Sequence, residues 1–198
     1  MDEYRYLGYT LDNKLKFKSQ IRNVVNKLSS CNYILARAHN FIPKFYLSIL
    51  FNSIGLTHIL YNKFIFINLS SNQKKKIQLK LYHSGSIIHH CLLKHVSGKV
   101  FNFDYILKFY TYIALYKIFT KNYAPQLKHL MKEKTHNHNT RHKSQFFIEY
   151  SRCNTSDFNF SLFAAKLWNW LPLSIREIQN IGAFKIELER VLDETLLS

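Results

Sequence analysis

The stretch that organises this sequence is Tyr6-Leu7-Gly8-Tyr9-Thr10-Leu11-Asp12. Apolar residues alternate with others along it, which is the two-residue period of a strand with one buried face. Asp12-Asn13 then predicts a turn, and a Lys-, Leu- and Phe-rich helical pattern follows at once. We therefore expect a short strand or hairpin whose pairing partner belongs to a part of the fold outside this chain.

Composition indicates a helical globular protein. The chain has 198 residues, of which 47% are hydrophobic and 16% aromatic, so it is long enough to bury a core in one domain or two small ones. Only 5 Gly and 3 Pro are present, and this scarcity favours long helices over a turn-rich β-sandwich or barrel.

The charge is strongly positive and unevenly distributed. There are 28 Lys+Arg against 12 Asp+Glu, a formal net charge of +16. Residues 4–143 hold 23 basic and 3 acidic side chains, whereas residues 144–198 hold 5 and 7. Such a balance favours a polyanionic partner, nucleic acid before an anionic membrane. The alternative is codon bias, because Lys, Asn, Ile, Phe and Tyr all have A/T-rich codons.

The remaining bulk features favour an intracellular chain, nuclear or cytoplasmic and not secreted. Cys31, Cys91 and Cys153 are odd in number and far apart, which fits no disulfide framework. The N-terminal residues are polar and lack a secretory signal pattern. The most apolar stretch, Ile54 to Leu69, is interrupted by polar residues and is too short to span a bilayer, so no membrane partner is expected.

Hydrophobic periodicity predicts a series of helices. Residues 14–40 carry apolar residues at steps of three and four, as one long amphipathic helix does. Pro43 separates this helix from the next, because proline disfavours helix in the residue before it. The further predicted helices are 45–54, 56–69, 73–96 with an interruption at Gly85, and 103–120. A short basic helix is predicted within 122–135 and an acidic helix at 184–196. Strand character is found at 146–150 and 158–162, and an apolar run at 162–171.

Basic residues gather on two of these helices. Lys74, Lys75 and Lys76 stand near the N-terminal end of the helix 73–96. The helix dipole favours anions at that end, so three lysines there oppose it. Their unfavourable placement indicates a bound phosphate or an acidic partner. The alternative is that each set forms a solvated helix face. The candidate nucleic-acid contacts from this pattern are Lys14, Lys18, Arg22, Lys74, Lys75 and Lys76.

No arrangement of residues supports catalysis or a metal site. Cys91 and His95 have the spacing of a zinc ligand pair, but the further candidates His136, His138, His142 and Cys153 lack a second paired set. We expect packed or solvated histidines, no metal site and no cofactor. Gly-rich phosphate loops and nucleophile elbows are absent from the sequence. Nucleotidyl transfer needs a close carboxylate pair for two magnesium ions, and the sequence has no such pair, so the chain by itself is not expected to be an enzyme or to bind a small-molecule substrate.

Several motifs resemble one known family. Tyr6 to Asp12 followed by Leu15-Lys16-Phe17 resembles the segment after the palm of non-LTR (LINE, jockey-like) retrotransposon reverse transcriptases, where a Leu-Gly hairpin near the primer grip leads into the thumb. Phe64 and Phe66 stand where that family usually carries a tryptophan. The resemblance continues in order through Phe41-Ile42-Pro43-Lys44, Leu50-Phe51-Asn52-Ser53, His58-Ile59-Leu60-Tyr61-Asn62, His138-Asn139-Thr140-Arg141, and Leu167-Trp168-Asn169-Trp170-Leu171-Pro172 with Ile175-Arg176 and Phe184-Lys185.

The resemblance implies a C-terminal fragment of an RNA-directed DNA polymerase that lacks the catalytic palm. The parent enzyme would need Mg²⁺, and the fragment would at most bind RNA or an RNA–DNA template–primer, with the missing palm domain as a second partner. By the same resemblance, Tyr6, Leu7 and Gly8 are primer-grip-like and Arg141 joins the candidate nucleic-acid contacts. The alternatives are a helical protein–protein interaction module and a non-functional transposon remnant.

The expected fold is mainly α. It is a helical thumb-like bundle, preceded by a short β-strand or hairpin and followed by a small α+β C-terminal subdomain. The expected divisions are a residual palm-edge strand at 1–13, a basic helical thumb-like domain at 14–135, a polar basic loop at 136–144, and an α+β subdomain at 145–198 that ends in an acidic amphipathic helix.

Overall fold

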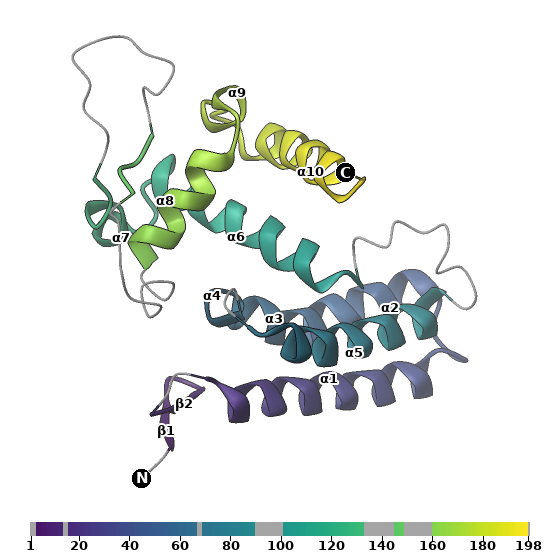
Figure 1. Ribbon diagram of the computed structural model, residues 1–198. Helices are drawn as coiled ribbons and strands as arrows, with labels where there is room; N and C mark the ends of the chain where they lie inside the picture. Colours follow the sequence, from purple (N-terminus) through teal and green to yellow (C-terminus); the bar gives the residue numbers. More distant parts are fainter. Residues whose placement is uncertain are drawn as a thin grey trace, which may run out of the picture. The chain divides into compact units, whose positions relative to one another are not determined.

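A computed structural model of the chain describes residues 3–13, 16–66, 69–89, 101–132, 145–148 and 160–197. It is mainly helical, with a two-stranded antiparallel hairpin near the N-terminus, which confirms the predicted mainly-α class (Figure 1). The chain divides into two compact units, residues 1–107 and 108–198, and the division falls inside helix α6. The expected boundary at 136–144 lies outside the described residues. Of the helices that are described, none is both long and apolar enough to cross a membrane.

The N-terminal hairpin confirms the expected short strand or hairpin, but it turns at Leu7-Gly8, within the stretch 6–12 that was predicted to be strand. Strands β1 (Glu3–Tyr6) and β2 (Tyr9–Asp12) pair with each other, and Leu7-Gly8 forms the turn between them. Both turn residues have positive φ, 46° and 83°, as the two-residue type I′ turn requires. Leu7 is therefore 70% exposed instead of buried, and β2 finds its partner within the chain.

The hairpin is held to the helices by a polar network. The backbone N–H of Thr10 donates to Gln20 Oε1 at 2.9 Å, and Gln20 Nε2 donates to Asn62 Oδ1 at 2.7 Å. Gln20 and Asn62 are both buried. The ring of Tyr9 stacks on that of Tyr61 with 4.9 Å between centroids, and the Tyr61 hydroxyl donates to the carbonyl of Leu7. These contacts fix β2 to the start of α1 and the end of α3.

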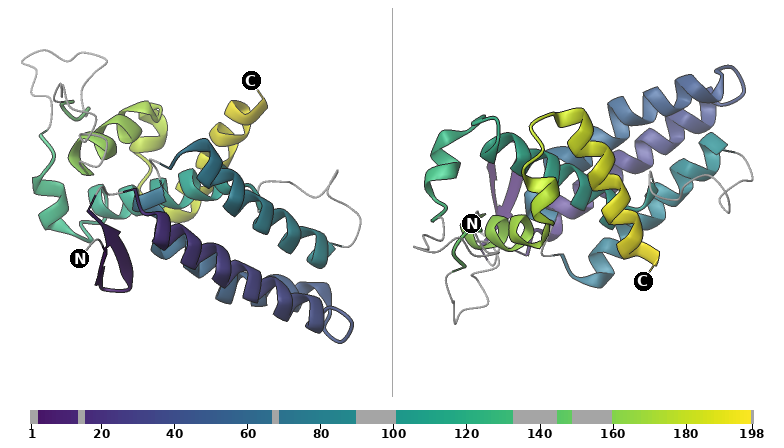
Figure 2. Two further views of the ribbon diagram at one scale, coloured as in Figure 1. Left: turned by 60° about the horizontal axis from the view of Figure 1, so that its bottom comes forward. Right: turned by 90° about the horizontal axis from the view of Figure 1, so that it is seen from above.

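The core of unit 1 is formed by two long helices, α1 and α5, that run side by side (Figures 1 and 2). Apolar residues of α1 at steps of three and four are buried along this seam, as the pattern at 14–40 predicted. A buried hydrogen bond between Ser84 and Asn32 links the two helices. The helices of this unit are α1 (Lys18–Ala38), α2 (Lys44–Leu50), the π-helix η1 (Phe51–Leu56), α3 (Thr57–Tyr61), α4 (Lys63–Phe66), α5 (Ser71–His89) and the start of α6 (Phe103–Phe119).

Gly85 does not interrupt α5, contrary to the prediction. A Cβ atom at this position would lie 3.0 Å from the ring of Phe101, so the missing side chain makes room for that ring. Phe101 is buried, and Gln78 of α5 donates to its carbonyl oxygen. The glycine therefore allows Phe101, which precedes α6, to pack closely against α5, and it does not end the helix.

Unit 2 is built around aromatic side chains. Tyr116 of α6 stacks on Phe184 with 4.3 Å between centroids, and Phe119 contacts Trp168 at 5.0 Å. Tyr116 and Phe119 of α6 are thus core residues. The strand character predicted at 158–162 is wrong from Phe160 onward, because α8 begins there, and residues 158–159 lie outside the described residues. The remaining helices are α7 (Pro125–His129), α8 (Phe160–Trp170), α9 (Leu173–Arg176) and α10 (Ile181–Leu197).

Candidate nucleic-acid interface

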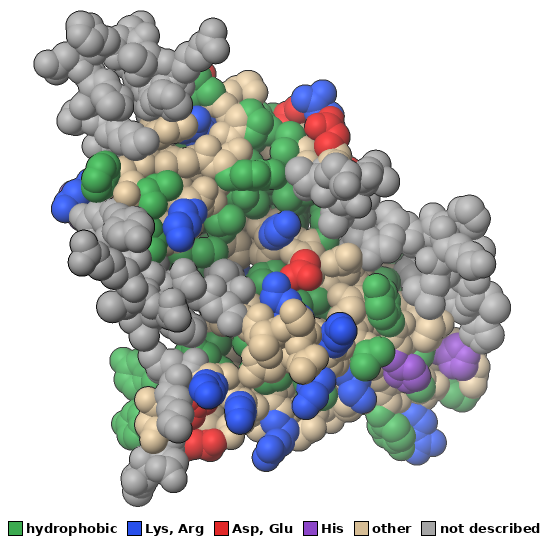
Figure 3. Space-filling model, in the orientation of Figure 1, with side chains coloured by type: hydrophobic (Ala, Val, Ile, Leu, Met, Phe, Trp, Pro, Cys, Tyr) green, Lys and Arg blue, Asp and Glu red, His purple; other side chains and the backbone are tan. Residues whose placement is uncertain are grey.

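A basic groove lies between α1 and the N-terminal part of α5. It has a volume of about 460 Å³, and the residues that line it are Lys18, Ile21, Arg22, Val25, Ser70, Gln73 and Lys76. Figure 3 shows a group of Lys and Arg side chains on the face of unit 1 where these two helices lie. None of the seven lining residues is acidic. We call this site the α1–α5 groove.

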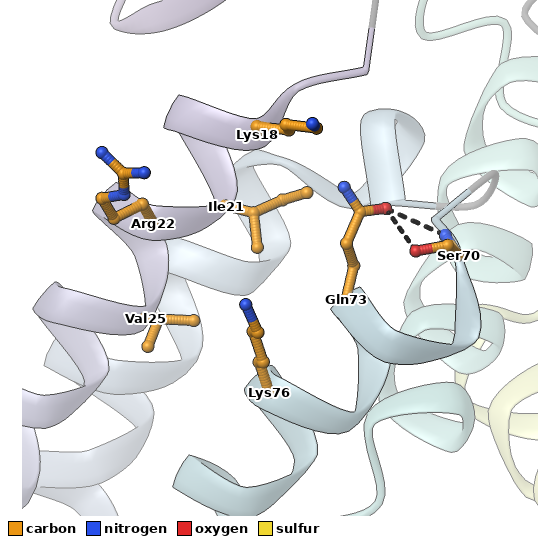
Figure 4. A pocket seen from close by; sticks show the side chains of 7 residues that line it. All are labelled: Lys18, Ile21, Arg22, Val25, Ser70, Gln73 and Lys76. Carbon is orange, nitrogen blue, oxygen red and sulfur yellow. Dashed lines mark hydrogen bonds between the residues drawn. The ribbon is translucent and has the colours of Figure 1, made fainter.

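The cations of the α1–α5 groove come from two helices. Lys18 and Arg22 are four residues apart on α1, so they lie on one face of that helix, and Lys76 reaches toward them from α5 (Figure 4). All three side chains are exposed. Within the described part of the chain, none of the three has a hydrogen-bonding or ion-pair partner. Their charge is therefore available to an anion that enters the groove.

The α1–α5 groove also has an apolar part. Ile21 and Val25 occupy the same face of α1 as the two cations, because the four positions follow the i, i+3, i+4, i+7 pattern of one helix face. Ile21 is buried in the helix seam, whereas Val25 is half-buried. The groove thus combines cationic edges with an aliphatic surface between them.

Gln73 sets the end of the α1–α5 groove. Its Oε1 accepts hydrogen bonds from the backbone N–H and the hydroxyl of Ser70, both at 3.0 Å, which caps the N-terminus of α5. Its Nε2 donates to the carbonyl of Lys16 at 3.2 Å and so ties α5 to the residues before α1. Both ends of the amide are occupied, so Gln73 holds the two helices at a fixed spacing. The sequence prediction missed this residue, although Ser70-Ser71-Asn72-Gln73 has the spacing of a capping box.

The other candidate cations are distributed differently. Lys74 forms an ion pair with Asp104 at 2.8 Å, so its charge is engaged within unit 1. Lys75 is exposed and does not line the groove. Lys14 and Arg141 lie outside the described residues. The structure thus brings together Lys18, Arg22 and Lys76 from the predicted set.

The primer-grip-like residues form the tip of the hairpin. Tyr6 precedes the turn and is exposed, and Leu7 and Gly8 are the turn itself. Gly8 lies against Tyr61, whose hydroxyl would be 3.6 Å from a Cβ at that position. The tip does not line the α1–α5 groove, but Thr10 and Gln20 connect the strand after it to the same end of α1.

The possible zinc ligands cannot be placed. Cys91, His95, His136, His138, His142 and Cys153 all lie outside the described residues. Among the residues that the structure describes, no group of three His, Cys, Asp or Glu side chains could hold a metal ion.

A second exposed surface is aromatic. Phe41 follows α1 and is 85% exposed, and Phe45 and Tyr46 at the start of α2 are also exposed. The rings of Phe45 and Tyr46 meet edge to face, with 5.5 Å between centroids. This surface belongs to unit 1, at the other end of α1 from the α1–α5 groove.

Comparison with known protein families, with curated proteins and with solved structures finds no match to this chain.

Proposed function

We propose that this chain binds the phosphate backbone of nucleic acid, RNA or an RNA–DNA template–primer, in the α1–α5 groove. The observation that carries the proposal is the convergence of Lys18, Arg22 and Lys76, from two helices, around a hollow with no acidic lining residue. Phosphate oxygens accept hydrogen bonds from Lys and Arg, and such contacts supply most of the affinity that does not depend on base sequence.

The resemblance to non-LTR retrotransposon reverse transcriptases supports the same activity. In that family the segment after the palm forms a thumb beside template and primer, and unit 1 occupies the resembling part of this chain. Nucleotidyl transfer would need the palm with its carboxylates and Mg²⁺, so we assign to this chain binding without catalysis. On this proposal, unit 1 serves as a helical thumb-like domain.

The test is fluorescence anisotropy with a labelled RNA–DNA hybrid that carries a single-stranded template extension. We expect binding at 50 mM salt that weakens by about 20- to 40-fold at 200 mM, because three phosphate contacts release about two to three counterions. Replacing the three groove cations with Glu (Lys18→Glu, Arg22→Glu, Lys76→Glu) is expected to weaken binding by at least about 100-fold at 50 mM salt.

A matched variant separates the groove from net charge. Lys27→Glu, Lys44→Glu and Lys75→Glu change the charge of unit 1 by the same amount at exposed positions that do not line the groove. We expect this control to weaken binding by less than about 10-fold, since distant exposed charges are screened. Absence of binding by the unmodified chain at 50 mM salt, or an equal loss in both variants, would contradict the proposal.

The exposed aromatic surface favours a second candidate function, a helical protein–protein interaction module. Phe41, Phe45 and Tyr46 offer large apolar side chains of the kind that anchor interfaces. In that case the positive charge reflects codon bias, and the chain would bind no nucleic acid at low salt. A non-functional transposon remnant would likewise show no groove-dependent binding, so the anisotropy experiment separates the first proposal from both alternatives.

A further inference from the structure

The shape of the α1–α5 groove bears on which form of nucleic acid it takes. The site is a hollow of about 460 Å³ between two packed helices, within the size range of small-ligand pockets. Duplexes are recognised by elements that project into their grooves, and a duplex is stiff over many base pairs. The phosphates of a duplex can therefore contact the cations at the edge of this hollow, but the sugars and paired bases of the duplex cannot enter it.

The apolar part of the groove also favours a single strand over a duplex. Ile21 and Val25 lie between Lys18, Arg22 and Lys76 (Figure 4), so an anion held by the cations has an aliphatic surface directly beside it. In a duplex the apolar faces of the bases are stacked on each other, whereas the bases of a single strand are free to splay out. A single strand can satisfy the cations and the aliphatic surface at once.

The uncharged polar side chains of the groove are engaged within the protein, and phosphate oxygens occupy its three cations in the proposed complex. The Gln73 amide is the one side-chain amide among the lining residues, and its oxygen and nitrogen are already bonded to Ser70 and to the carbonyl of Lys16. The Ser70 hydroxyl donates to Gln73. Base readout needs donors and acceptors that face the base edge, so the groove should hold any nucleotide about equally well.

We infer that the α1–α5 groove selects single-stranded nucleic acid over duplex without regard to base sequence. It holds phosphates of the strand on Lys18, Arg22 and Lys76 and a sugar or base against the half-buried Val25. This inference rests on the proposed function and adds the form of the ligand: on a template–primer, the groove takes the unpaired template extension.

The experiment compares three labelled probes of equal length by anisotropy at 50 mM salt: an oligo-uridine strand, an oligo-adenosine strand and a blunt RNA–DNA hybrid. We expect both single strands to bind at least about 10-fold more tightly than the hybrid and within about threefold of each other. The slope of log affinity against log salt should be about −2 for the single strands, because each of three phosphate contacts contributes about 0.7.

Two variants at one position test the aliphatic surface. Val25→Ser replaces the half-buried aliphatic group with a hydroxyl and leaves the three cations of the groove in place, so it should remove most of the preference for single strands. Val25→Ala keeps the hollow open and should retain the preference. Circular dichroism of both variants verifies that the helices are intact, and Val25→Thr replaces Val25→Ser if the latter does not fold.

The outcomes separate this inference from the function on which it rests. If no probe binds at 50 mM salt, the proposed function fails. Equal or tighter binding of the blunt hybrid, or a preference that survives in Val25→Ser, overturns the inference and leaves phosphate binding in place. A preference of more than about 10-fold between the two single strands contradicts the absence of base readout.

Discussion

Two cation-lined hollows, one in each unit, use their charges in opposite ways. The α1–α5 groove of unit 1 is lined by three exposed cations and no carboxylate. A smaller hollow of about 300 Å³ in unit 2 is lined by Lys128 and Arg176 together with Glu177. Lys128 donates to the carbonyl of Phe119 at 3.4 Å, and Arg176 is only 9% exposed.

The difference shows that the number of basic residues does not identify a binding surface. In unit 2, burial lowers the pKa of Arg176 and the charge of Glu177 partly opposes this, so the guanidinium acts as part of the core. In unit 1 the cations stand on a helical scaffold that Gln20, Gln73 and the α1–α5 seam hold together. Charge in unit 1 should therefore affect binding, whereas charge in unit 2 should affect stability.

The largest effect is expected from a pair of arginine substitutions. Arg176→Ala should destabilise unit 2 by about 2–3 kcal/mol, because it empties a buried site, and should leave oligonucleotide affinity unchanged. Arg22→Ala should weaken oligonucleotide binding by about 5- to 10-fold and change stability by less than about 0.5 kcal/mol. Both tryptophans, Trp168 and Trp170, belong to unit 2, so tryptophan fluorescence during urea denaturation follows that unit. Circular dichroism during the same denaturation also reports the helices of unit 1, and the comparison fails if Arg22→Ala lowers the midpoint of unit 1 as much as Arg176→Ala lowers that of unit 2.

A smaller effect is expected at Gln73. Gln73→Ala removes the cap of α5 and the bond to Lys16, which should cost about 1 kcal/mol and loosen the groove, so that affinity falls by about three- to fivefold. The exposed neighbour Asn72 is the matched control, since Asn72→Ala touches neither bond. Thermal denaturation followed by circular dichroism, together with anisotropy, measures both quantities. Equal affinities for the two variants would mean that Gln73 does not shape the groove.

Part of this account could be predicted from sequence and part could not. Hydrophobic periodicity and helix-breaking residues predicted the long helices and the short helix that begins at Pro125, because these are local properties of the chain. The sequence predicts strand at the Leu7-Gly8 turn, since the alternation of apolar residues continues through it and positive φ is uncommon for leucine. The sequence predicts a helix interruption at Gly85, because the packing of this glycine against Phe101 depends on tertiary structure.

The candidate cations show the same limit. Their residue types and helices could be read from the sequence, but which of them converge could not. Lys74 and Lys76 are two residues apart on α5 and therefore point to different sides, one to Asp104 and the other to the groove. Which side faces α1 is set by the buried seam between the two helices, through pairs such as Asn32 and Ser84.

The Lys74–Asp104 pair provides a third and smaller test. Lys74→Ala should cost less than about 1 kcal/mol of stability, because the pair is partly exposed, and should reduce affinity by less than about twofold. Asp104→Ala should raise affinity slightly, since it releases the charge of Lys74. Anisotropy at 50 mM salt decides between this result and a large loss in Lys74→Ala, which would add Lys74 to the binding surface.

The smallest effect is a pH dependence at His58 in unit 1. Burial, and secondly the charge of Lys27, lower the pKa of His58. The unfolded chain therefore binds a proton more readily than the folded one, so unit 1 should lose stability as pH falls below about 6.5 toward the lowered pKa, and should be insensitive above it. Lys27→Ala should reduce this loss, and His58→Gln should abolish it. Urea denaturation followed by circular dichroism at pH 7.5 and 5.5 measures the difference, and an equal pH effect in His58→Gln would assign it to other groups.

The central claim is that the cations of the α1–α5 groove, and not the basic residues in general, bind nucleic acid. Lysine acetylation with and without a bound single-stranded oligonucleotide, read out by mass spectrometry, tests it at many lysines in one experiment. We predict that the oligonucleotide slows acetylation of Lys18 and Lys76 by at least about fivefold and leaves Lys27, Lys44 and Lys75 within about twofold of their free rates. Protection spread evenly over these lysines, or concentrated on Lys128 and Lys166 of unit 2, would contradict the account.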